Sequence, residues 1–214
     1  MLKKQIKSKE RVANYGEVNT SEKEINSMLD LVKQETERYD SRFLEPACGD
    51  GNFLIKVLDR KLKILQSEFK KNQFEFEKNL IVIIGSIYGI DLLNDNVTNA
   101  RERLFTRSSE VYKKYFKDYL NFDFINSISF ILKRNIINGD ALTLKRVDSE
   151  DPIIFSEWSL IKNKVKRRDF NLSDLVDYSD LENNSLFSSM GVSITQPIKE
   201  FDLLNYDKLF KYAE

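Results

Sequence analysis

The sequence predicts a mixed α/β fold with three layers and a mainly parallel sheet. Residues 42–53, RFLEPACGDGNF, have the pattern of a buried strand, a glycine turn and the start of a helix. Residues 87–92 and 135–142 have the pattern of two further strands, and an acidic residue stands near the end of each. A strand, a glycine turn and a helix form the usual ligand-binding corner of an open α/β sheet.

Three regions follow from this pattern. We expect residues 1–20 to be a polar lead-in, residues 21–150 to form the ligand-binding domain, and residues 151–214 to form a small appendage of a hairpin, a loop and a tail. Ser21 and Glu24 have the spacing of a capping box, so a helix is expected to begin there. Its apolar stripe consists of Ile25, Met28, Leu29 and Val32.

Apolar residues at helical spacing continue after the glycine turn, from Leu54 to Phe69, and predict a helix from Asn52 to about Lys78. Residues 80–84, LIVII, fit a strand by their β-branched side chains, or a helix that ends at Gly85. Asn94 or Asp95 is expected to cap the next helix. The aromatic residues of 110–133 fit a core better than a stacking platform for bases.

The carboxyl-terminal region has a different pattern. Residues 153–158 are expected to form a strand, and residues 162–168 a basic turn or a second strand paired with it. This basic segment is the best candidate for contacts with nucleic-acid phosphates, and a charged edge hairpin is the alternative. Residues 171–200 are expected to form a loop, and residues 201–212 a tail that docks on a surface or on a partner. The candidate phosphate-contacting residues are Lys164, Lys166, Arg167 and Arg168.

The glycine turn narrows the choice of ligand. Gly49 and Gly51 let the backbone approach a ligand closely, but Leu54 stands where a dinucleotide fingerprint has its third glycine. A phosphate loop would need a lysine after the glycine, whereas this turn carries Glu45 and Asp50. Two carboxylates suit a ligand with positive charge and hydroxyl groups, such as S-adenosylmethionine. The alternative is an ordinary turn that binds nothing.

Two later acids strengthen the ligand-binding interpretation. Asp91 and Asp140 end the second and third predicted strands. The carboxyl ends of parallel strands face the ligand crevice of a doubly wound sheet. A carboxylate there can accept hydrogen bonds from ribose hydroxyl groups. One acid at a strand end is usually a helix cap, but three in successive turns favour a binding site.

Composition excludes several kinds of chemistry. The 214 residues contain 34 basic and 34 acidic side chains, so no net charge attracts the chain to nucleic acid or membrane. There is no histidine, and Cys48 is the only cysteine, which excludes disulfides, Cys/His zinc sites and a histidine base. No metal site is expected. No apolar run approaches the length of a membrane span, so a cytoplasmic protein is expected.

Four segments carry a resemblance to a known family. The four segments resemble motifs of the adenine-specific DNA methyltransferases of restriction-modification systems, and they occur in the same order along the chain. They are GEVNTS, FLEPACGDGNF, IYGIDLLNDNV and NIINGDAL. The resemblance covers about residues 10–160 and, more loosely, the rest of the chain. It implies a Rossmann-like methyltransferase domain that binds S-adenosylmethionine, and it favours a helix at residues 80–84.

The resemblance also assigns residues to the parts of the cofactor. It implies that the turn after the first strand surrounds the methionine part, through Glu45, Ala47, Gly49, Gly51 and Phe53. Asp50 in the same turn is a further candidate for binding the cofactor. Asp91 and Leu92 would contact the ribose and the edge of the adenine. Asp140 and Ala141 would contact the adenine amino group. Thr20 would lie near the methionine carboxylate.

The chain departs from the family in two places. Asn19 and Ser21 replace the usual Phe and Pro of the upstream segment. More important, the family's catalytic motif is a polar residue followed by Pro-Pro and an aromatic residue, and no two of the three prolines here are adjacent. Asp151-Pro152 is expected to start a strand, with a degenerate catalytic loop as the alternative. Catalytic residues are therefore not assigned.

Three functions remain open. The chain can be a subunit or truncated form of an adenine-specific DNA methyltransferase that acts on DNA with a second methyltransferase or specificity subunit. It can also be a catalytically inactive subunit that keeps the cofactor pocket for a structural or regulatory role. A small-molecule methyltransferase is the third possibility, and it would need a cap over the pocket.

Overall fold

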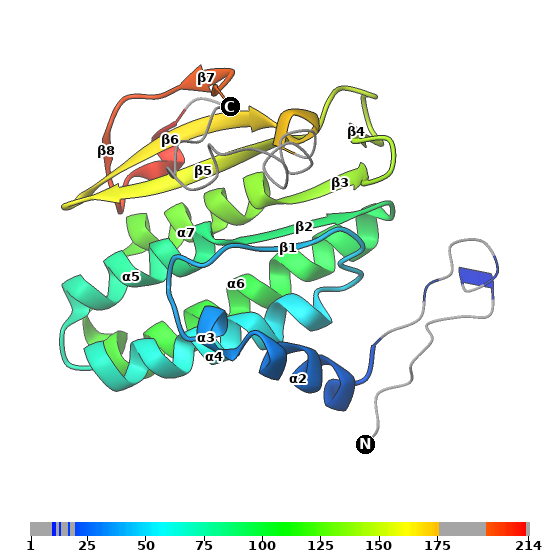
Figure 1. Ribbon diagram of the computed structural model, residues 1–214. Coiled ribbons are helices and arrows are strands. Elements are labelled where there is room, and N and C mark those ends of the chain that lie inside the picture. The colour runs from blue at the N-terminus through cyan, green and yellow to red at the C-terminus, as the bar shows by residue number, and fades with distance from the viewer. Residues whose placement is uncertain (1–9, 12, 14–16, 18–19, 176–195, 213–214) are drawn as a thin grey trace, which may run out of the picture.

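The computed structural model of the chain describes residues 10, 11, 13, 17, 20–175 and 196–212. Most of the expected lead-in and most of the loop expected at 171–200 lie outside these residues. The described fold is mixed α/β, as predicted, and contains two four-stranded sheets. Figure 1 shows the mainly parallel sheet in the middle, with helices on one side and the second sheet on the other.

The first sheet has the strand order β1-β2-β3-β4. The first three strands are parallel, with Leu44 opposite Tyr88 and Ile90 opposite Ile137, and the short β4 is antiparallel to β3. All three strands predicted in this region are present, and their carboxyl ends meet at one edge. Their bounds are β1 (Phe43–Glu45), β2 (Ile87–Asp91), β3 (Ile136–Asp140) and β4 (Lys145–Arg146).

Two long helices pack against one face of this sheet, and two others run directly into its strands. α4 contacts β1 and β2, and α6 contacts β2 and β3. α5 ends just before β2 and α7 ends just before β3, so each helix continues into a strand (Figure 1). The bounds are α2 (Glu22–Leu31), α3 (Lys33–Thr36), α4 (Asn52–Phe69), α5 (Gln73–Gly85), α6 (Asn94–Phe116), η1 (Lys117–Tyr119) and α7 (Phe122–Asn135).

Local signals explain most of these helices. The capping box of Ser21 and Glu24 is present at the start of α2, as predicted. The helix expected from Asn52 to about Lys78 is wrong in length, because α4 ends at Phe69 and the side chain of Asn72 caps a new helix. That helix, α5, includes residues 80–84, which confirms the helical interpretation.

Two further expectations concern α6 and the aromatic region after it. Neither Asn94 nor Asp95 caps α6, since its N-cap is Leu93 and no side chain caps it. In the aromatic region, four side chains are buried and confirm the core interpretation: Tyr112, Phe116, Phe124 and Phe130. Tyr119 and Phe122 are exposed.

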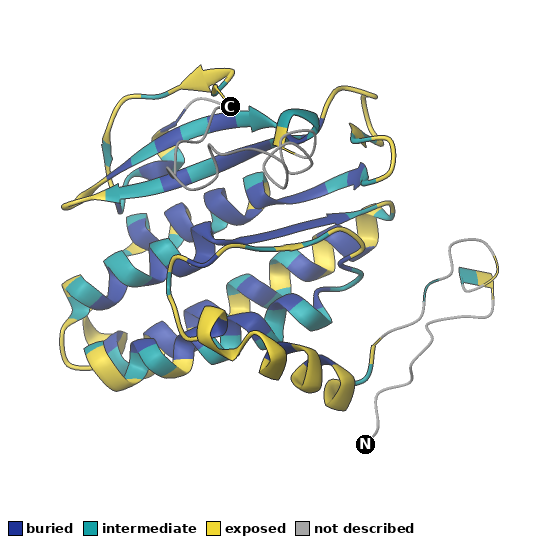
Figure 2. Cartoon of the chain, in the orientation of Figure 1, coloured by how far each residue is buried: buried dark blue, intermediate teal, exposed yellow. Residues whose placement is uncertain are grey.

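The second sheet covers the other face of the first. The hairpin of β5 and β6 is present as predicted, and β7 and β8 pair with β6. A second core cluster joins the two sheets and contains Tyr88, Ile90, Ile137, Ile153, Phe155 and Leu172. The hairpin that we expected as a small appendage therefore shares a core with β2 and β3, and Figure 2 shows those strands buried beneath it. The bounds are β5 (Ile154–Ile161), β6 (Lys164–Asn171), β7 (Lys199–Glu200) and β8 (Leu204–Asn205).

The carboxyl-terminal tail docks on the helical layer, as predicted. The hydroxyl group of Tyr206 donates a 2.8 Å hydrogen bond to the buried carboxylate of Glu77 in α5. The short helix η3 (Leu209–Lys211) packs against α7, where the Leu209 N–H donates to the Ser127 hydroxyl group at 2.9 Å. Within the described residues, no helix is long and apolar enough to cross a membrane.

Candidate cofactor-binding site

The glycine turn after β1 has the conformation that the sequence predicted. Gly49 and Gly51 have φ values of 52° and 84°, in the left-handed region that side chains with a Cβ rarely adopt. The Gly51 N–H donates to the Cys48 carbonyl at 2.9 Å, which closes the turn. A Cβ on Gly51 would also lie 3.1 Å from the Cβ of Ala100 in α6. The turn therefore requires glycine at position 51 both for conformation and for space.

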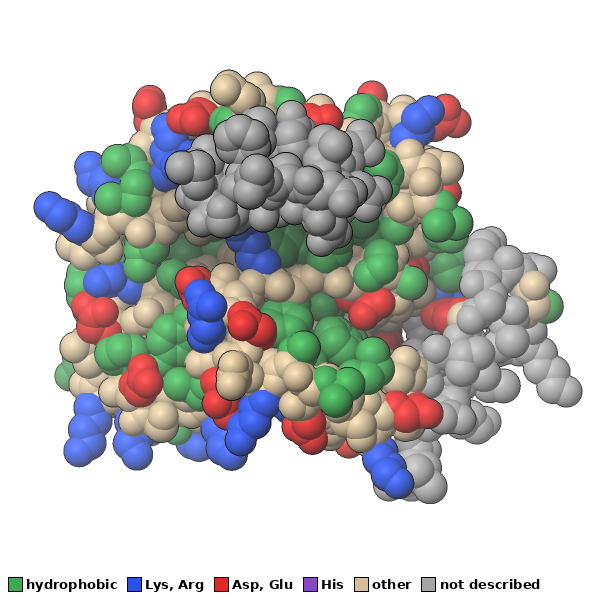
Figure 3. Space-filling model, in the orientation of Figure 1, with side chains coloured by type: hydrophobic (Ala, Val, Ile, Leu, Met, Phe, Trp, Pro, Cys, Tyr) green, Lys and Arg blue, Asp and Glu red, His purple; other side chains and the backbone are tan. Residues whose placement is uncertain are grey.

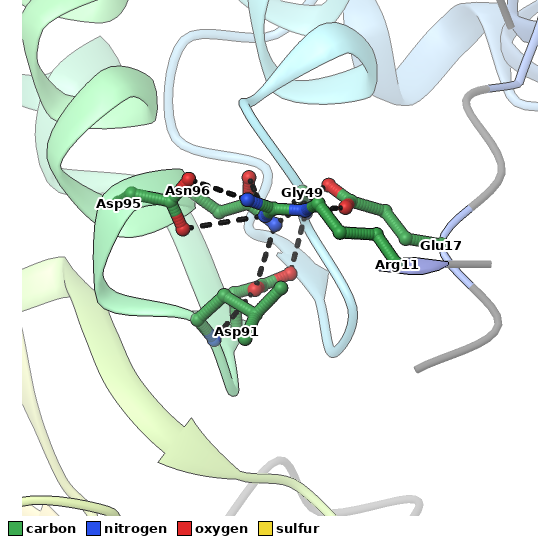
Figure 4. A network of polar contacts seen from close by, with 7 residues as sticks. Arg11, Glu17, Gly49, Asp91, Asp95 and Asn96 are labelled. Carbon is green, nitrogen blue, oxygen red and sulfur yellow. Dashed lines mark hydrogen bonds and ion pairs between the residues drawn. The ribbon is translucent and has the colours of Figure 1, made fainter. Parts of the chain in front are cut away.

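Asp91 at the end of β2 holds this turn in place. One carboxylate oxygen accepts a 2.8 Å hydrogen bond from the Gly49 N–H. The other accepts bonds from the Leu93 N–H at 2.9 Å and from the Asn96 side-chain amide at 3.0 Å (Figure 4). A carboxylate has about four acceptor positions, so these three bonds leave about one for a ligand.

A polar network extends from Asp91 to the amino-terminal part of the chain. Asn96 is buried in the first turn of α6, and its amide also donates to Glu17 at 3.0 Å. Arg11 pairs with Glu17, donates to the Asn96 side-chain oxygen at 3.1 Å and pairs with Asp95 at 2.7 Å (Figure 4). The sequence reasoning missed Arg11, Glu17 and Asn96, because nothing in the local pattern connects residues about 80 positions apart.

The other acids of the site have different environments. Glu45 is half-buried at the end of β1, and loss of hydration raises its pKa. Asp140 accepts a 2.8 Å hydrogen bond from the Leu142 N–H and so caps its own turn. Asp50 forms a 2.9 Å ion pair with Arg103 of α6. The negative charge that we expected Asp50 to offer a cofactor is therefore compensated within the protein.

The remaining candidate residues differ in exposure. Ala47 and Leu92 are exposed, and Phe53 and Ala141 are half-buried. Thr20 is exposed and stands just before the N-cap of α2. Asn138 of β3 donates to the carbonyl groups of Asp91 and Leu92 at 3.0 and 2.9 Å, which ties the end of β3 to the end of β2. Within the predicted set, the Gly49 N–H donates to Asp91, and the backbone of Ala47 donates to the Glu45 carboxylate.

Two kinds of chemistry have no support at this site. The Cys48 thiol is buried, and burial raises its pKa above the ordinary value, so it is a poor nucleophile. The described part of the chain contains no cluster of three or more His, Cys, Asp or Glu side chains that could hold a metal ion.

The basic segment of the hairpin is largely neutralised. Arg167 was expected to contact phosphates, but it is fully buried, pairs with Asp169 at 2.8 Å and packs on the ring of Phe201. Its inclusion in the patch is therefore wrong. Lys166 pairs with Glu200 at 3.1 Å and Arg168 with Glu157 at 3.0 Å, while Lys164 is exposed. The alternation of a strand places Arg167 inward and its neighbours outward, which the run of basic letters does not reveal.

In comparisons with protein-family models, curated proteins and solved structures, nothing matches this chain. The class of fold therefore follows from the structure itself, which is a mixed α/β fold with a mainly parallel four-stranded sheet and is compatible with a Rossmann-like arrangement.

Proposed function

We propose that the chain binds S-adenosylmethionine and acts as a subunit, or a truncated form, of an adenine-specific DNA methyltransferase of a restriction-modification system. The resemblance of four sequence segments suggested this function. The observation that best supports it is the hydrogen bond from the Gly49 N–H to Asp91, which joins two of those segments at the carboxyl ends of β1 and β2. Ligands of doubly wound sheets bind at that edge.

The residues present fit the cofactor in chemical type. Glu45 and Asp91 place carboxylates near the turn, where they suit the ammonium and hydroxyl groups of the ligand, and Leu92 offers an exposed apolar surface for the adenine. When bound, the cofactor would supply the methyl group for transfer. The structure refines the role of Asp91, because three of its acceptor positions are occupied and only about one remains for a ribose hydroxyl group.

The test of binding is calorimetric titration of the purified chain with S-adenosylmethionine and with its demethylated product. We expect micromolar affinity for at least one of them. Asp91→Ala should weaken binding by about 1.5 to 3 kcal/mol, the scale for hydrogen bonds to a charged group. Asp118→Ala is the matched control, because this exposed acid follows the far end of α6, about 34 Å along the helix from the site. No binding of either compound would refute the proposal.

An assay of methyl transfer to DNA distinguishes an active methyltransferase subunit from an inactive one. The chain lacks the Pro-Pro motif, so we expect the isolated chain to transfer no methyl group to double-stranded DNA. An inactive structural or regulatory subunit remains the alternative, and a small-molecule methyltransferase is the second. If a polypeptide that carries an Asn-Pro-Pro-Tyr motif is encoded next to this chain and restores transfer, the subunit proposal holds. If that polypeptide binds but no transfer follows, the inactive alternative is favoured.

A further inference from the structure

The outer edge of β1 is open among the described residues. β1 pairs only with β2, so it is the edge strand of the parallel sheet. The Phe43 N–H donates to the Ser86 carbonyl at 2.9 Å, which directs the backbone groups of Phe43 toward β2. Successive residues of a strand alternate, so the N–H and carbonyl groups of Leu44 point to the open side. The side chain of Leu44 is 44% exposed.

A cavity of about 390 Å³ is lined in part by Asp40 and Arg42, which directly precede β1. It lies at the amino end of β1, away from the glycine turn, and its walls include Arg42, Tyr88, Trp158 and Leu160. Leu44 is opposite Tyr88 in the register, so both side chains lie on the face that the second sheet covers. The hairpin covers this face over β2 and β3 but leaves Leu44 exposed at β1. Edge and cavity together offer backbone hydrogen bonds and a side-chain pocket, the two requirements for adding a strand.

The charges at the rim favour a polypeptide over a nucleic acid. Arg42 pairs with Glu157, and Asp40 pairs with Arg38 at 3.2 Å. Within each pair the positive and negative charges cancel, whereas binding of a phosphate backbone requires positive charge that is not cancelled. The residues between these pairs are uncharged and include Tyr88, Trp158, Ser159 and Leu160. An uncharged strand is the occupant that fits.

The direction of the sheet argues against a second copy of the chain. Two copies related by a twofold axis would pair β1 with β1 in antiparallel fashion, over three residues only. A doubly wound sheet instead consists of two halves joined by parallel strands, and β1-β2-β3 has the order of one half.

Helix α2 also presents exposed apolar side chains that a larger partner could cover. Leu31 at the end of α2 is 87% exposed, and Met28 in the same helix is 50% exposed. Figure 3 shows hydrophobic side chains gathered over α2 on the face of the molecule that also presents β1. We propose that the open edge of β1 and the adjacent cavity are the docking surface for a parallel, uncharged β-strand of a second α/β polypeptide. The proposal does not depend on cofactor binding.

The test uses the purified chain and a synthetic probe, a heptapeptide of alternating valine and threonine. Nuclear magnetic resonance should show rapid amide exchange at Leu44 in the free chain, and slower exchange with shifted Leu44 resonances when the peptide is added. The same peptide with all of its backbone nitrogens methylated should not bind. Leu44→Asp should weaken binding of the unmodified peptide at least tenfold. Leu142→Asp is the matched control, because Leu142 is 95% exposed beyond β3, and it should leave binding unchanged.

Three outcomes would overturn the proposal. A Leu44 amide that is already protected in the free, monomeric chain would mean that the edge is covered. A peptide that fails to bind, or that binds Leu44→Asp equally well, would exclude strand addition at this edge. A dimer in light scattering that Leu44→Asp dissociates would assign the surface to a second copy.

Discussion

The backbone N–H of Gly49 and the carboxylate of Asp91 are joined by a 2.8 Å hydrogen bond across 42 residues of sequence. This bond connects the turn after β1 to the end of β2. The same carboxylate also accepts from Leu93 and Asn96, so one side chain organises the turn, the strand end and the first turn of α6. Asp91 is therefore a structural residue of the site as well as a candidate ligand-binding residue.

Asp91→Ala should lower the free energy of unfolding by about 1 to 3 kcal/mol, because it leaves backbone N–H groups without their acceptor. Chemical denaturation measures the change. Asp95→Ala is the control, since Asp95 is exposed and pairs with Arg11, and it should cost less than about 1 kcal/mol. Equal losses in the two variants would contradict the organising role of Asp91.

Gly89→Ala should destabilise the protein by about 1 to 3 kcal/mol through overpacking. A Cβ at position 89 would lie 2.9 Å from the Leu54 side chain and 3.0 Å from the Cys48 sulfur atom. Because Cys48→Ala removes that sulfur, the double variant should be more stable than the sum of the single losses predicts, by about 0.5 kcal/mol or more. Strictly additive losses would show that the two positions do not crowd each other.

Lys61 should make stability depend on pH. Its ammonium group is buried and donates to the carbonyl groups of Tyr39 and Ser41 and to the Ser86 hydroxyl group, and burial lowers its pKa to about 7. In the unfolded chain the pKa returns to its ordinary value of 10.5. At pH values between these two pKa values the unfolded state binds more protons than the folded state, so the free energy of unfolding rises with pH. The contribution of Lys61 to stability is therefore complete above pH 10.5 and is lost as the pH falls toward 7.

The measurement for Lys61 is the unfolding free energy of the wild type and of Lys61→Met from pH 7 to pH 10. The difference between the two proteins should shift in favour of the wild type by a few kcal/mol as the pH rises, at about 1.4 kcal/mol for each unit of pKa difference. Comparison with the variant cancels the titration of other groups. Parallel curves would mean that the pKa of Lys61 is the same in both states.

Arg167→Met should destabilise the fold by about 3 to 5 kcal/mol, because it leaves the buried carboxylate of Asp169 without its main partner. Lys164→Met should change the stability by less than about 0.5 kcal/mol, since Lys164 is exposed. Thermal denaturation distinguishes the two variants. A small effect at Arg167 would indicate that the pair with Asp169 is dispensable.

Local sequence patterns predicted most of the elements of the fold. The alternation and β-branched residues of the strands, the glycines of the turn and the capping box of Ser21 depend on neighbours within a few positions. Two predictions were wrong, the carboxyl-terminal boundary of α4 and the cap of α6. The side chain of Asn72, a weak sequence signal, starts a new helix after α4. Asp91, and not Asn94 or Asp95, accepts the hydrogen bond of the Leu93 N–H at the start of α6.

The sequence by itself determined the order of strand, glycine turn and helix, and the acids that end the strands, because these features are encoded by adjacent residues. Only the tertiary structure decided that Asp91 binds Gly49, that Asp50 is neutralised by Arg103 and that Arg167 is buried. It also decided that the hairpin covers β2 and β3 but, among the described residues, leaves Leu44 of β1 exposed. These outcomes depend on contacts between residues far apart in the chain, whose energies are set by packing and desolvation in the folded state.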